Sequence, residues 1–481
     1  MPAYQPDPES LAAHPVPAWF GEAKLGVLIH WGLYSVPAWA PLTGHITDLL
    51  RDRFGETCKL SPYAEWYENS LRFPDGPTAA HHAQAWPGWA YADFRGPFEA
   101  ALERWRPEPW AELFAEAGVR YVVPVTKHHD GFTLWPSGAE TPLRGRWSAP
   151  RDVVGELAAA CRAGGQRFGV YYSGGLDWSF DARPVANLGE MLASVPTSVA
   201  YRRHVLTHYG ELIERYDPDL LWNDIAYPDA GDLWGLLAGF YGGREDRLVN
   251  DRFGPAGPLQ ARLQDLDALA RFNARMAERM TEPGLAFAPA PPPVFDYRTP
   301  EYAGFADIQP EPWECVRGLS SSFGFKRNDP DRLDGPAVIR LLADVVSRNG
   351  NLLLGVGPDA EGRIVEPERD ALLALGAWLR VNGEAVFGTT PWRCAEGLTG
   401  AGTPIRFTRR RATVHAIVLE RLPPGPCTLD GFGEGARPDR VRVLGRGEVP
   451  FRIEPGGRLA VEIPPGLDAE PAVTLALDGA A

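Results

Sequence analysis

Cysteine, methionine and long apolar runs are scarce in this sequence. Its 481 residues include five cysteines and four methionines. The cysteines lie far apart and form no CxxC motif, which argues against a disulfide framework and favours a reducing compartment. No run of about 18 apolar residues occurs, so a membrane span is not expected. Residues 1–20 lack a basic segment followed by an apolar one, so we expect no secretion signal and a cytoplasmic location.

Positive charge is also in deficit. The chain carries 48 Lys and Arg against 62 Asp and Glu, which gives a formal net charge of −14. Nucleic-acid-binding proteins usually have a basic face, so we expect neither nucleic acid nor an anionic membrane surface as a partner. A neutral ligand such as a sugar is compatible with this balance.

What the sequence does contain is an ordinary globular composition, with 44% hydrophobic and 11% aromatic residues. A single hydrophobic core stops growing near about 250–300 residues. We therefore expect one large domain and a second, smaller one.

Short apolar runs recur through the first three-quarters of the chain, and helix-like patterns separate them. The runs are rich in Val, Leu and aromatic residues and too short for helices, which is typical of strands buried on both faces of a parallel sheet. Alternation of this kind predicts a (β/α)₈ barrel, with a doubly wound sheet as the alternative. The expected strands cover 25–30, 121–129, 168–173, 220–224, 248–252 and 351–355, and the clearest helical patterns cover 108–118, 152–164, 338–346 and 372–378.

Two further segments depart from this rhythm. Residues 255–295 form an insertion with a helical pattern at 259–280 and a Pro-rich, extended stretch at 285–294. The insertion is either a peripheral addition or a lid or subunit contact. After about residue 385 the hydrophobic period changes to two, which predicts a C-terminal β-sandwich. The predicted domains are thus a catalytic domain at 1–384 and a sandwich at 385–481.

Polar and aromatic residues follow the apolar runs, where a barrel carries its working side chains. Because the carboxyl ends of the strands meet at one face, we expect these residues to converge. Histidines and carboxylates can bond sugar hydroxyls, and aromatic rings can cover the apolar face of a sugar. The converging residues are His30, His128, His129, Tyr171, Trp222, Asp224 and Arg252.

Each of these residues also has a purely structural interpretation. His30 could be a core histidine, and Tyr171 and Trp222 could be barrel packing. Asp224 could cap the following helix. Arg252 could pair with its neighbour Asp251. A further alternative is a metal-dependent barrel hydrolase with the histidines as ligands, although no HxH, HExxH or Cys/His spacing occurs.

At these positions the sequence closely resembles glycoside hydrolase family 29, the retaining α-L-fucosidases. The resemblance covers residues 19 to about 392, and it rests on motifs that occur together in the same order. They include IHWG at 29–32, EWYENSLR at 65–72, TKHHDGF at 126–132, FGVYYSGGLDW at 168–178, LWND at 221–224, RTPEY at 298–302 and WECVRG at 313–318.

The resemblance implies an exo-acting enzyme that hydrolyses terminal α-linked L-fucose with retention of configuration and without a metal or organic cofactor. It also implies that Asp224 is the nucleophile and that Glu301 is the general acid/base, with Glu314 as the rival for that role. A retaining pair of carboxyl groups lies roughly 5–5.5 Å apart. A fucose-binding protein that has lost catalysis is the remaining alternative, and a homo-oligomer stays open.

The same resemblance implies a set of fucose-binding residues. Phe323 corresponds to an aromatic residue that packs on the methyl side of the sugar. Phe325 and Lys326 replace the Tyr and Asn of the commoner family pattern. This difference bears on contacts with the leaving group and not on the fucose pocket. The implied binding residues are His30, Glu65, Trp66, His128, His129, Tyr171, Trp222, Arg252 and Phe323.

Overall fold

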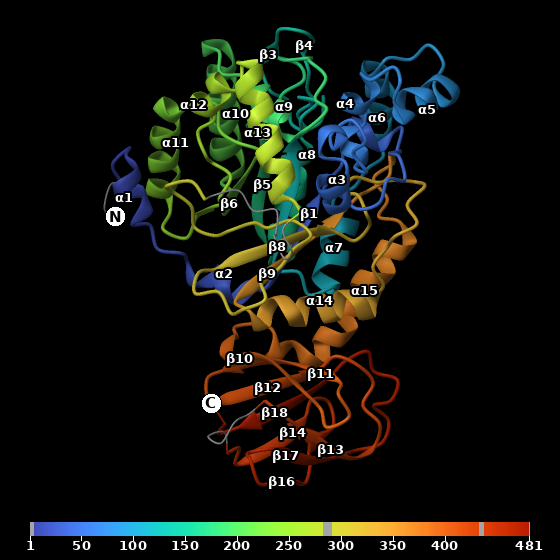
Figure 1. Ribbon diagram of the computed structural model, residues 1–481, viewed down its shortest axis with the longest axis vertical. Coiled ribbons are helices and arrows are strands. Elements are labelled where there is room, and N and C mark those ends of the chain that lie inside the picture. The colour runs from blue at the N-terminus through green and yellow to red at the C-terminus, as the bar shows by residue number, and fades with distance from the viewer. Residues whose placement is uncertain (1–3, 282–290, 432–436, 481) are drawn as a thin grey trace.

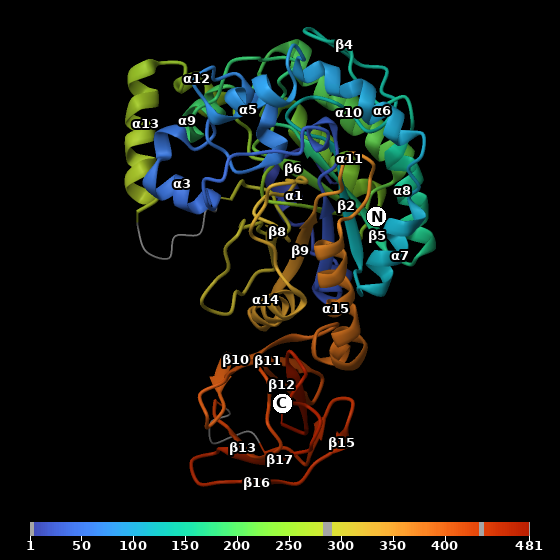
Figure 2. The ribbon, with the colours of Figure 1, turned by 90° about the vertical axis from the view of Figure 1, so that its right-hand side faces the viewer.

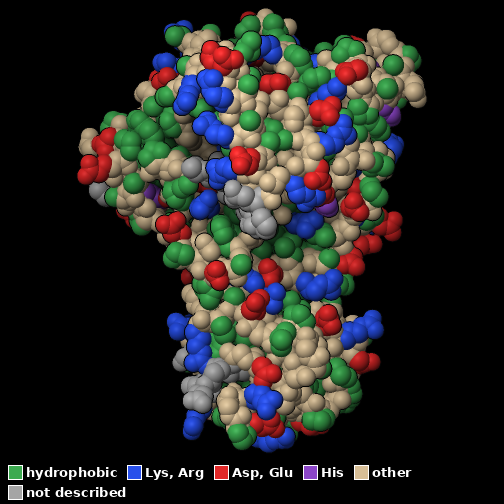
Figure 3. Space-filling model, viewed as in Figure 1, with side chains coloured by type: hydrophobic (Ala, Val, Ile, Leu, Met, Phe, Trp, Pro, Cys, Tyr) green, Lys and Arg blue, Asp and Glu red, His purple; other side chains and the backbone are tan. Residues whose placement is uncertain are grey.

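The computed structural model describes residues 4–281, 291–431 and 437–480. The chain forms an α/β domain and, beneath it in Figure 1, a smaller domain of antiparallel strands. In Figure 3, acidic and basic side chains are interspersed over the visible face of both domains.

A curled, seven-stranded parallel sheet lies at the centre of the α/β domain, with the order β7-β6-β5-β2-β1-β9-β8. Its strands are buried on both faces, as the apolar runs predict. The order and the surrounding helices confirm the barrel prediction over the doubly wound alternative. The strands are β1 (Leu25–Ile29), β2 (Tyr121–Lys127), β5 (Arg167–Ser173), β6 (Leu220–Asp224), β7 (Leu248–Val249), β8 (Trp313–Gly318) and β9 (Gly350–Val356).

The gap between the two edge strands, β7 and β8, is bridged by residues 297–301 instead of a regular strand. Asn250, just after β7, pairs in parallel with Tyr297, while Arg298 and Glu301 pair in parallel with Trp313 and Val316 of β8. The sheet therefore closes through an irregular eighth segment. The apolar-run pattern predicts neither this segment nor β8.

Two of the helices that cover the sheet begin and end close to where the sequence predicts them. Asp152 caps α8 (Val153–Ala163) by accepting a hydrogen bond from the Gly155 N–H at 2.9 Å. Pro lies in the first turn of α7 (Glu108–Glu116), and Gly118 follows its end in the left-handed region at φ 82°. The remaining covering helices are α10 (Val199–Tyr216), α11 (Ala230–Gly243), α14 (Gly335–Ser347) and α15 (Glu366–Asn382).

Shorter elements build the rim above the sheet and the segment before it. They are α1 (Pro8–Ala12), α2 (Ala18–Ala23), η1 (Leu33–Ser35), α3 (Ile46–Asp52), η2 (Phe54–Glu56), η3 (Ala64–Trp66), α4 (Tyr67–Leu71), α5 (Pro77–Ala85), η4 (Tyr91–Phe94), α6 (Arg95–Leu102), β3 (Glu140–Thr141), β4 (Gly145–Arg146) and α9 (Leu188–Ala193).

The insertion contains two helices where the sequence predicts one. These are α12 (Gly257–Arg262) and α13 (Leu266–Arg279). The break arises because Asp265 adopts an extended conformation and caps α13, accepting a hydrogen bond from the Ala268 N–H at 2.7 Å. Most of the Pro-rich stretch predicted at 285–294 lies outside the described residues.

The C-terminal strands form a six-stranded and a three-stranded antiparallel sheet, which confirms the sandwich class. Their alternating apolar residues, such as Phe407, Val414 and Leu475, are fully buried between them. A short 3₁₀ helix, η5 (Gly383–Ala385), precedes these strands. The strands are β10 (Thr390–Leu398), β11 (Pro404–Arg410), β12 (Thr413–Val418), β13 (Gly425–Leu429), β14 (Arg440–Val443), β15 (Gly447–Glu448), β16 (Phe451–Ile453), β17 (Leu459–Ile463) and β18 (Val473–Asp478).

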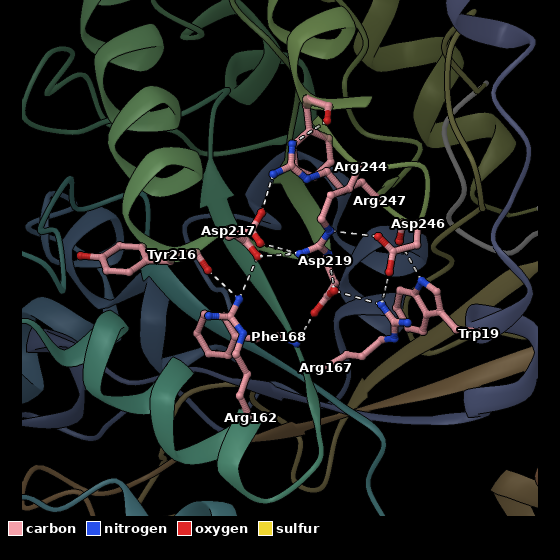
Figure 4. Close-up of polar contacts among 11 residues, drawn as sticks. Trp19, Arg162, Arg167, Phe168, Tyr216, Asp217, Asp219, Arg244, Asp246 and Arg247 are labelled. Atoms are coloured by element: carbon pink, nitrogen blue, oxygen red, sulfur yellow. Dashed lines mark hydrogen bonds and ion pairs between the residues drawn. The ribbon is translucent and has the colours of Figure 1, made fainter. Parts of the chain in front are cut away.

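An ion-pair network ties together the amino ends of β5, β6 and β7, on the side of the barrel away from the strand carboxyl ends (Figure 4). Asp219, just before β6, accepts hydrogen bonds from Arg167 Nη1 at 3.0 Å and from Arg244. Its second oxygen accepts from the Phe168 N–H at 2.8 Å. Arg167 also reaches Asp246 at 2.7 Å. Three strand starts thus share one mostly buried carboxylate.

We therefore expect Asp219→Ala to destabilise the barrel by about 2–3 kcal/mol, because it leaves the buried Phe168 N–H without its acceptor and removes one of the acceptors of Arg167 and of Arg244. Urea unfolding followed by tryptophan fluorescence measures the change. Glu112→Ala, at an exposed position on α7, is the control and should leave the unfolding midpoint where it is. A midpoint for Asp219→Ala equal to that of the control would contradict the structural role.

Candidate active site

One cavity at the carboxyl ends of the strands brings together all the predicted site residues except Glu314. They come from six strands or the turns that follow them, from the rim helix η3 and from the bridging segment. The predicted residues that line the cavity are His30, Glu65, Trp66, His128, His129, Tyr171, Trp222, Asp224, Arg252, Glu301 and Phe323.

Asp224 is the last residue of β6, and the turn after it holds its carboxylate in the cavity. The Ile225 N–H donates to Asp224 Oδ1 at 2.8 Å. Ile225 has a φ of 68°, a left-handed conformation that is strained for a β-branched residue. The helix-cap interpretation of Asp224 is wrong, since Asp229 caps α11 and accepts from the Gly231 N–H.

Arg252 joins the two predicted catalytic carboxylates. Its Nη1 lies 2.9 Å from Asp224 Oδ1, and its Nη2 lies 2.6 Å from Glu301 Oε1. Thr299 fixes the guanidinium by accepting from Nε at 3.0 Å and, through its carbonyl, from Nη2 at 2.9 Å. The two carboxyl groups therefore face the same side of the cavity. The structural pairing of Arg252 with Asp251 is not found, because Asp251 accepts instead from Thr299.

The same surroundings move the two pKa values in opposite directions. Burial alone raises the pKa of Asp224, but the positive charge of Arg252 and the hydrogen bond from Tyr171 outweigh it, and the pKa lies below its usual value. Burial likewise raises the pKa of Glu301, and although Arg252 opposes this, the negative charge of Asp224 adds to it. The pKa of Glu301 stays above its usual value. One carboxylate is thus kept ionised and the other is biased toward protonation.

His129 presents an acceptor nitrogen to the cavity. Its Nδ1 lies 2.7 Å from the Ser173 hydroxyl oxygen, and that hydroxyl donates its own proton to the Leu176 carbonyl at 2.8 Å. Nδ1 must therefore carry the proton and donate to Ser173. Burial lowers the pKa of His129 to about 4, so the ring is neutral and Nε2, which lies 3.9 Å from Asp224, keeps a lone pair.

His30 and His128 are neutral for the same reason and still have hydrogen-bonding capacity to spare. Burial lowers the pKa of His30 to about 3 and the pKa of His128 well below its usual value. The Nδ1 atoms of both rings, and the hydroxyl of Tyr63 in the same cavity, are buried without a partner among the described residues. A ligand rich in hydroxyl groups would satisfy such atoms. β2 ends at Lys127, which allows both His128 and His129 to face the cavity.

Glu65 is held by the turn that carries Phe323. Its Oε2 accepts from the Gly324 N–H at 2.8 Å and from the Ser322 hydroxyl at 3.2 Å. A Cβ on Gly324 would lie 3.0 Å from this oxygen and 3.1 Å from the Tyr34 ring, so the close approach favours glycine here. Burial raises the pKa of Glu65 to about 7.

Aromatic rings form the walls of the cavity. Tyr171 stacks on Trp222 with centroids 5.3 Å apart, and Phe323 stacks on His30 at 5.1 Å. Trp66 meets His129 edge-on at 5.1 Å. The cavity thus combines apolar faces with polar atoms at its edges.

Glu314 lies beneath this cavity and does not line it. Its carboxylate is fully buried and accepts from the Tyr121 hydroxyl at 2.6 Å and from Trp222 Nε1 at 3.1 Å. The structure therefore favours Glu301 over Glu314 as the group that reaches a ligand.

Sequence reasoning missed a second set of lining residues. Tyr63 lies two residues before Glu65, and Leu28, Ile225 and Val316 lie in or directly beside quoted motifs, so these could have been found. The others lie in segments with no recognisable motif. Conversely, Phe325 and Lys326 do not line the cavity, and Lys326 is buried against Ser321 and the Pro62 carbonyl. The missed residues are Leu28, Ile46, Thr47, Leu50, Thr57, Cys58, Ser61, Tyr63, Leu188, Met191, Ile225 and Val316.

The described residues contain neither a metal-binding cluster nor a membrane-spanning helix. No group of three or more His, Cys, Asp or Glu side chains within 4–281, 291–431 and 437–480 is arranged to hold a metal ion. Over the same ranges, no helix combines the length and apolar character needed to cross a bilayer.

Comparisons with known proteins agree with this geometry. A family model described as Alpha-L-fucosidase matches residues 1–384. The tissue alpha-L-fucosidase of Homo sapiens is 30% identical over 496 residues, covering 99% of this chain and 92% of that protein. The Mus musculus enzyme is 31% identical over 427 residues, covering 86% and 80%.

Solved structures give the same result. The alpha-fucosidase of Thermotoga maritima superposes with a TM-score of 0.81 at 35% identity, covering 98% of this chain and 99% of that one. The same enzyme in complex with fucose superposes with a TM-score of 0.80 at 35% identity, with the same coverage.

A barrel that brings two carboxylates with opposite pKa shifts together in one cavity at its mouth is typical of a glycoside hydrolase. The chain belongs to the α-L-fucosidase family, glycoside hydrolase family 29, and is a fucose-releasing glycosidase.

The hydroxyl of Tyr171 donates to Asp224 Oδ2 and thereby lowers the pKa of that carboxyl group. We expect Tyr171→Phe to raise the pKa of Asp224 and to move the acidic limb of the kcat/KM profile to higher pH, by about one unit. Rates on an aryl fucoside across pH measure the limb. Tyr216→Phe, whose hydroxyl bonds Asp152 on a distant helix, should leave the profile as it is. An unshifted limb in Tyr171→Phe would show that this hydroxyl does not set the ionisation.

Proposed function

We propose that this chain hydrolyses terminal α-linked L-fucose with retention, through a covalent fucosyl-enzyme formed on Asp224. The observation that supports this most directly is the shared guanidinium of Arg252, which holds two carboxylates with opposite pKa shifts on one side of a cavity. Ionised Asp224 would attack the anomeric carbon, and protonated Glu301 would donate its proton to the departing oxygen.

The second half of the reaction follows from the same charges. The negative charge of Asp224 raises the pKa of Glu301. Once Asp224 is esterified, that charge is gone, and the pKa of Glu301 falls. Glu301 then remains ionised and can take a proton from the incoming water, which the hydrolysis of the ester requires.

The neutral histidines and Glu65 would bind the sugar hydroxyls. His30 and His128 have buried nitrogen atoms without partners, and His129 presents a lone pair. Phe323 and Trp66 supply apolar faces for the C5 methyl group that distinguishes fucose from hydroxylated hexoses. Apolar walls alone discriminate only about 10²-fold against an added hydroxyl, so hydrogen bonds must read the rest of the sugar. The Thermotoga maritima neighbour, which was crystallised with fucose, supports fucose as the ligand.

Two other functions remain as alternatives. A fucose-binding protein without catalysis would not need two carboxylates with opposed pKa shifts. A metal-dependent hydrolase gains no support from the arrangement of the described residues. The Thermotoga maritima enzyme, which is 35% identical to this chain, was crystallised with a mechanism-based inhibitor, and this further supports the retaining mechanism.

Labelling with a 2-fluoro-fucosyl fluoride tests the nucleophile. The electron-withdrawing fluorine slows hydrolysis of the ester, so one label per chain should accumulate, and peptide mapping should locate it on Asp224. Asp229→Asn, five residues away at a helix cap, should label like the parent enzyme, while Asp224→Asn should not label. A label on any other carboxylate would overturn the assignment.

Glu301→Ala tests the acid/base. We expect kcat/KM on an alkyl fucoside, whose leaving group needs a proton, to fall by roughly 10²–10⁴-fold. A dinitrophenyl fucoside needs no proton and should still react in the first step. Azide should then restore turnover and yield a fucosyl azide of retained configuration. Glu314→Ala is the matched comparison and should gain no turnover from azide. Azide rescue of Glu314→Ala but not of Glu301→Ala would reverse the assignment.

A further inference from the structure

The outer part of the cavity is lined by side chains of a different character from the inner part. Ile46 and Leu50 come from α3, and Leu188 and Met191 come from α9. Ile225 completes the set directly after Asp224. We call these five residues the apolar rim.

Burial orders the cavity from floor to opening. His30, His128 and Tyr171 are at most 3% exposed. In the apolar rim, Leu50, Leu188 and Met191 are 6–8% exposed, and Ile46 and Ile225 are only partly buried. The side chain of Glu301 is 21% exposed, so it is accessible from the opening of the cavity. A terminal sugar on the floor therefore directs its leaving group past Glu301 and along the apolar rim.

Two of the three Ser and Thr hydroxyl groups that line this cavity already bond the protein backbone. Thr57 donates to the Phe54 carbonyl at 3.0 Å. Ser61 accepts from the Tyr63 N–H at 3.3 Å. Thr47 lies at the exposed edge of the opening. A second sugar at this position would bury its own hydroxyls against carbon atoms, which costs free energy for each group left unpaired.

The insertion at 255–295 packs against α9, which carries Leu188 and Met191 of the apolar rim. Gln264 donates to the Ala193 carbonyl at the end of α9 at 2.8 Å. Met276 and Met280 of the insertion pack against the same apolar cluster that contains Leu188 and Met191. Figure 2 shows α3, α9 and α13 gathered on one side of the barrel. The rim is thus a supported wall and not a set of isolated exposed side chains.

We propose that this enzyme is adapted to fucosides whose leaving group is apolar, an alkyl or aryl aglycone, in preference to fucosylated oligosaccharides. The proposal rests on the proposed function, because it assigns the fucose to the floor of the cavity and the leaving group to its opening. The insertion is then neither a bare addition nor a lid but the outer support of the leaving-group subsite.

A series of alkyl α-L-fucosides tests the proposal. Methyl, butyl and octyl fucosides have leaving groups of nearly equal basicity, so chain length changes contacts with the rim and not the chemistry. Burial of added methylene groups should raise kcat/KM from methyl to octyl by at least about tenfold. 2′-Fucosyllactose, added as a competing substrate, should be hydrolysed with a lower kcat/KM than the octyl fucoside.

Variants identify the contact surface. Met191→Gln and Leu188→Gln should cut the octyl-to-methyl ratio of kcat/KM by about three- to tenfold, because they put amide groups into the apolar wall. Leu42→Gln, at a 62% exposed position in the segment before α3, is the control and should keep the parent ratio.

The outcomes separate the two proposals. Release of fucose from all substrates with no dependence on chain length, or with the oligosaccharide preferred, overturns the apolar subsite and leaves the fucosidase mechanism standing. An unchanged octyl-to-methyl ratio in both rim variants does the same. No release from any fucoside overturns the proposed function and the subsite with it.

Discussion

The fork of Arg252 is the constraint on which the site depends. One guanidinium contacts Asp224 and Glu301 and takes the carbonyl of Thr299 as a third acceptor. A carboxylate pair buried at this depth would otherwise share a proton, since like charges in a low dielectric cannot both persist. The positive charge of Arg252 keeps Asp224 ionised, while repulsion from Asp224 holds the pKa of Glu301 above its usual value. One shared contact thus gives the two carboxyl groups different protonation states.

The barrel supplies this contact through two different kinds of support. Asp224 ends a regular strand that is paired on both sides, with β5 and with β7. Arg252 follows the short strand β7, and Glu301 lies on a segment held by isolated bridges. Each carboxylate is followed by a non-glycine residue with a positive φ: Ile225 at 68° follows Asp224, and Tyr302 at 49° follows Glu301. Backbone strain of this kind is maintained only where the surroundings fix it, and here it turns both carboxylates toward the cavity.

The sequence carries much of this arrangement in recognisable form. The apolar runs predict five of the strands that border the cavity, because burial on both faces leaves a strong signal. The residues after them, such as His30 and Asp224, follow from the rule that strand ends meet at one face. The alternation near residue 300 is too short and too irregular to predict a strand, so Glu301 could be reached only through the resemblance. The apolar rim could not be predicted, because Ile46 and Met191 lie on two short helices, α3 and α9, that meet at the cavity only through tertiary packing.

The bridging segment at 297–301 constrains the position of Glu301 in the chain less than a regular strand would. A residue on a strand cannot shift along the chain without breaking a ladder of hydrogen bonds, so Asp224 is tied to its neighbours in sequence. Glu301 follows a long insertion and contacts the sheet only at single points. Additions or deletions upstream can therefore be absorbed without disturbing the barrel. The position of Glu301, the proposed proton donor, can therefore shift along the chain, whereas the position of Asp224, the proposed nucleophile, is fixed by its strand.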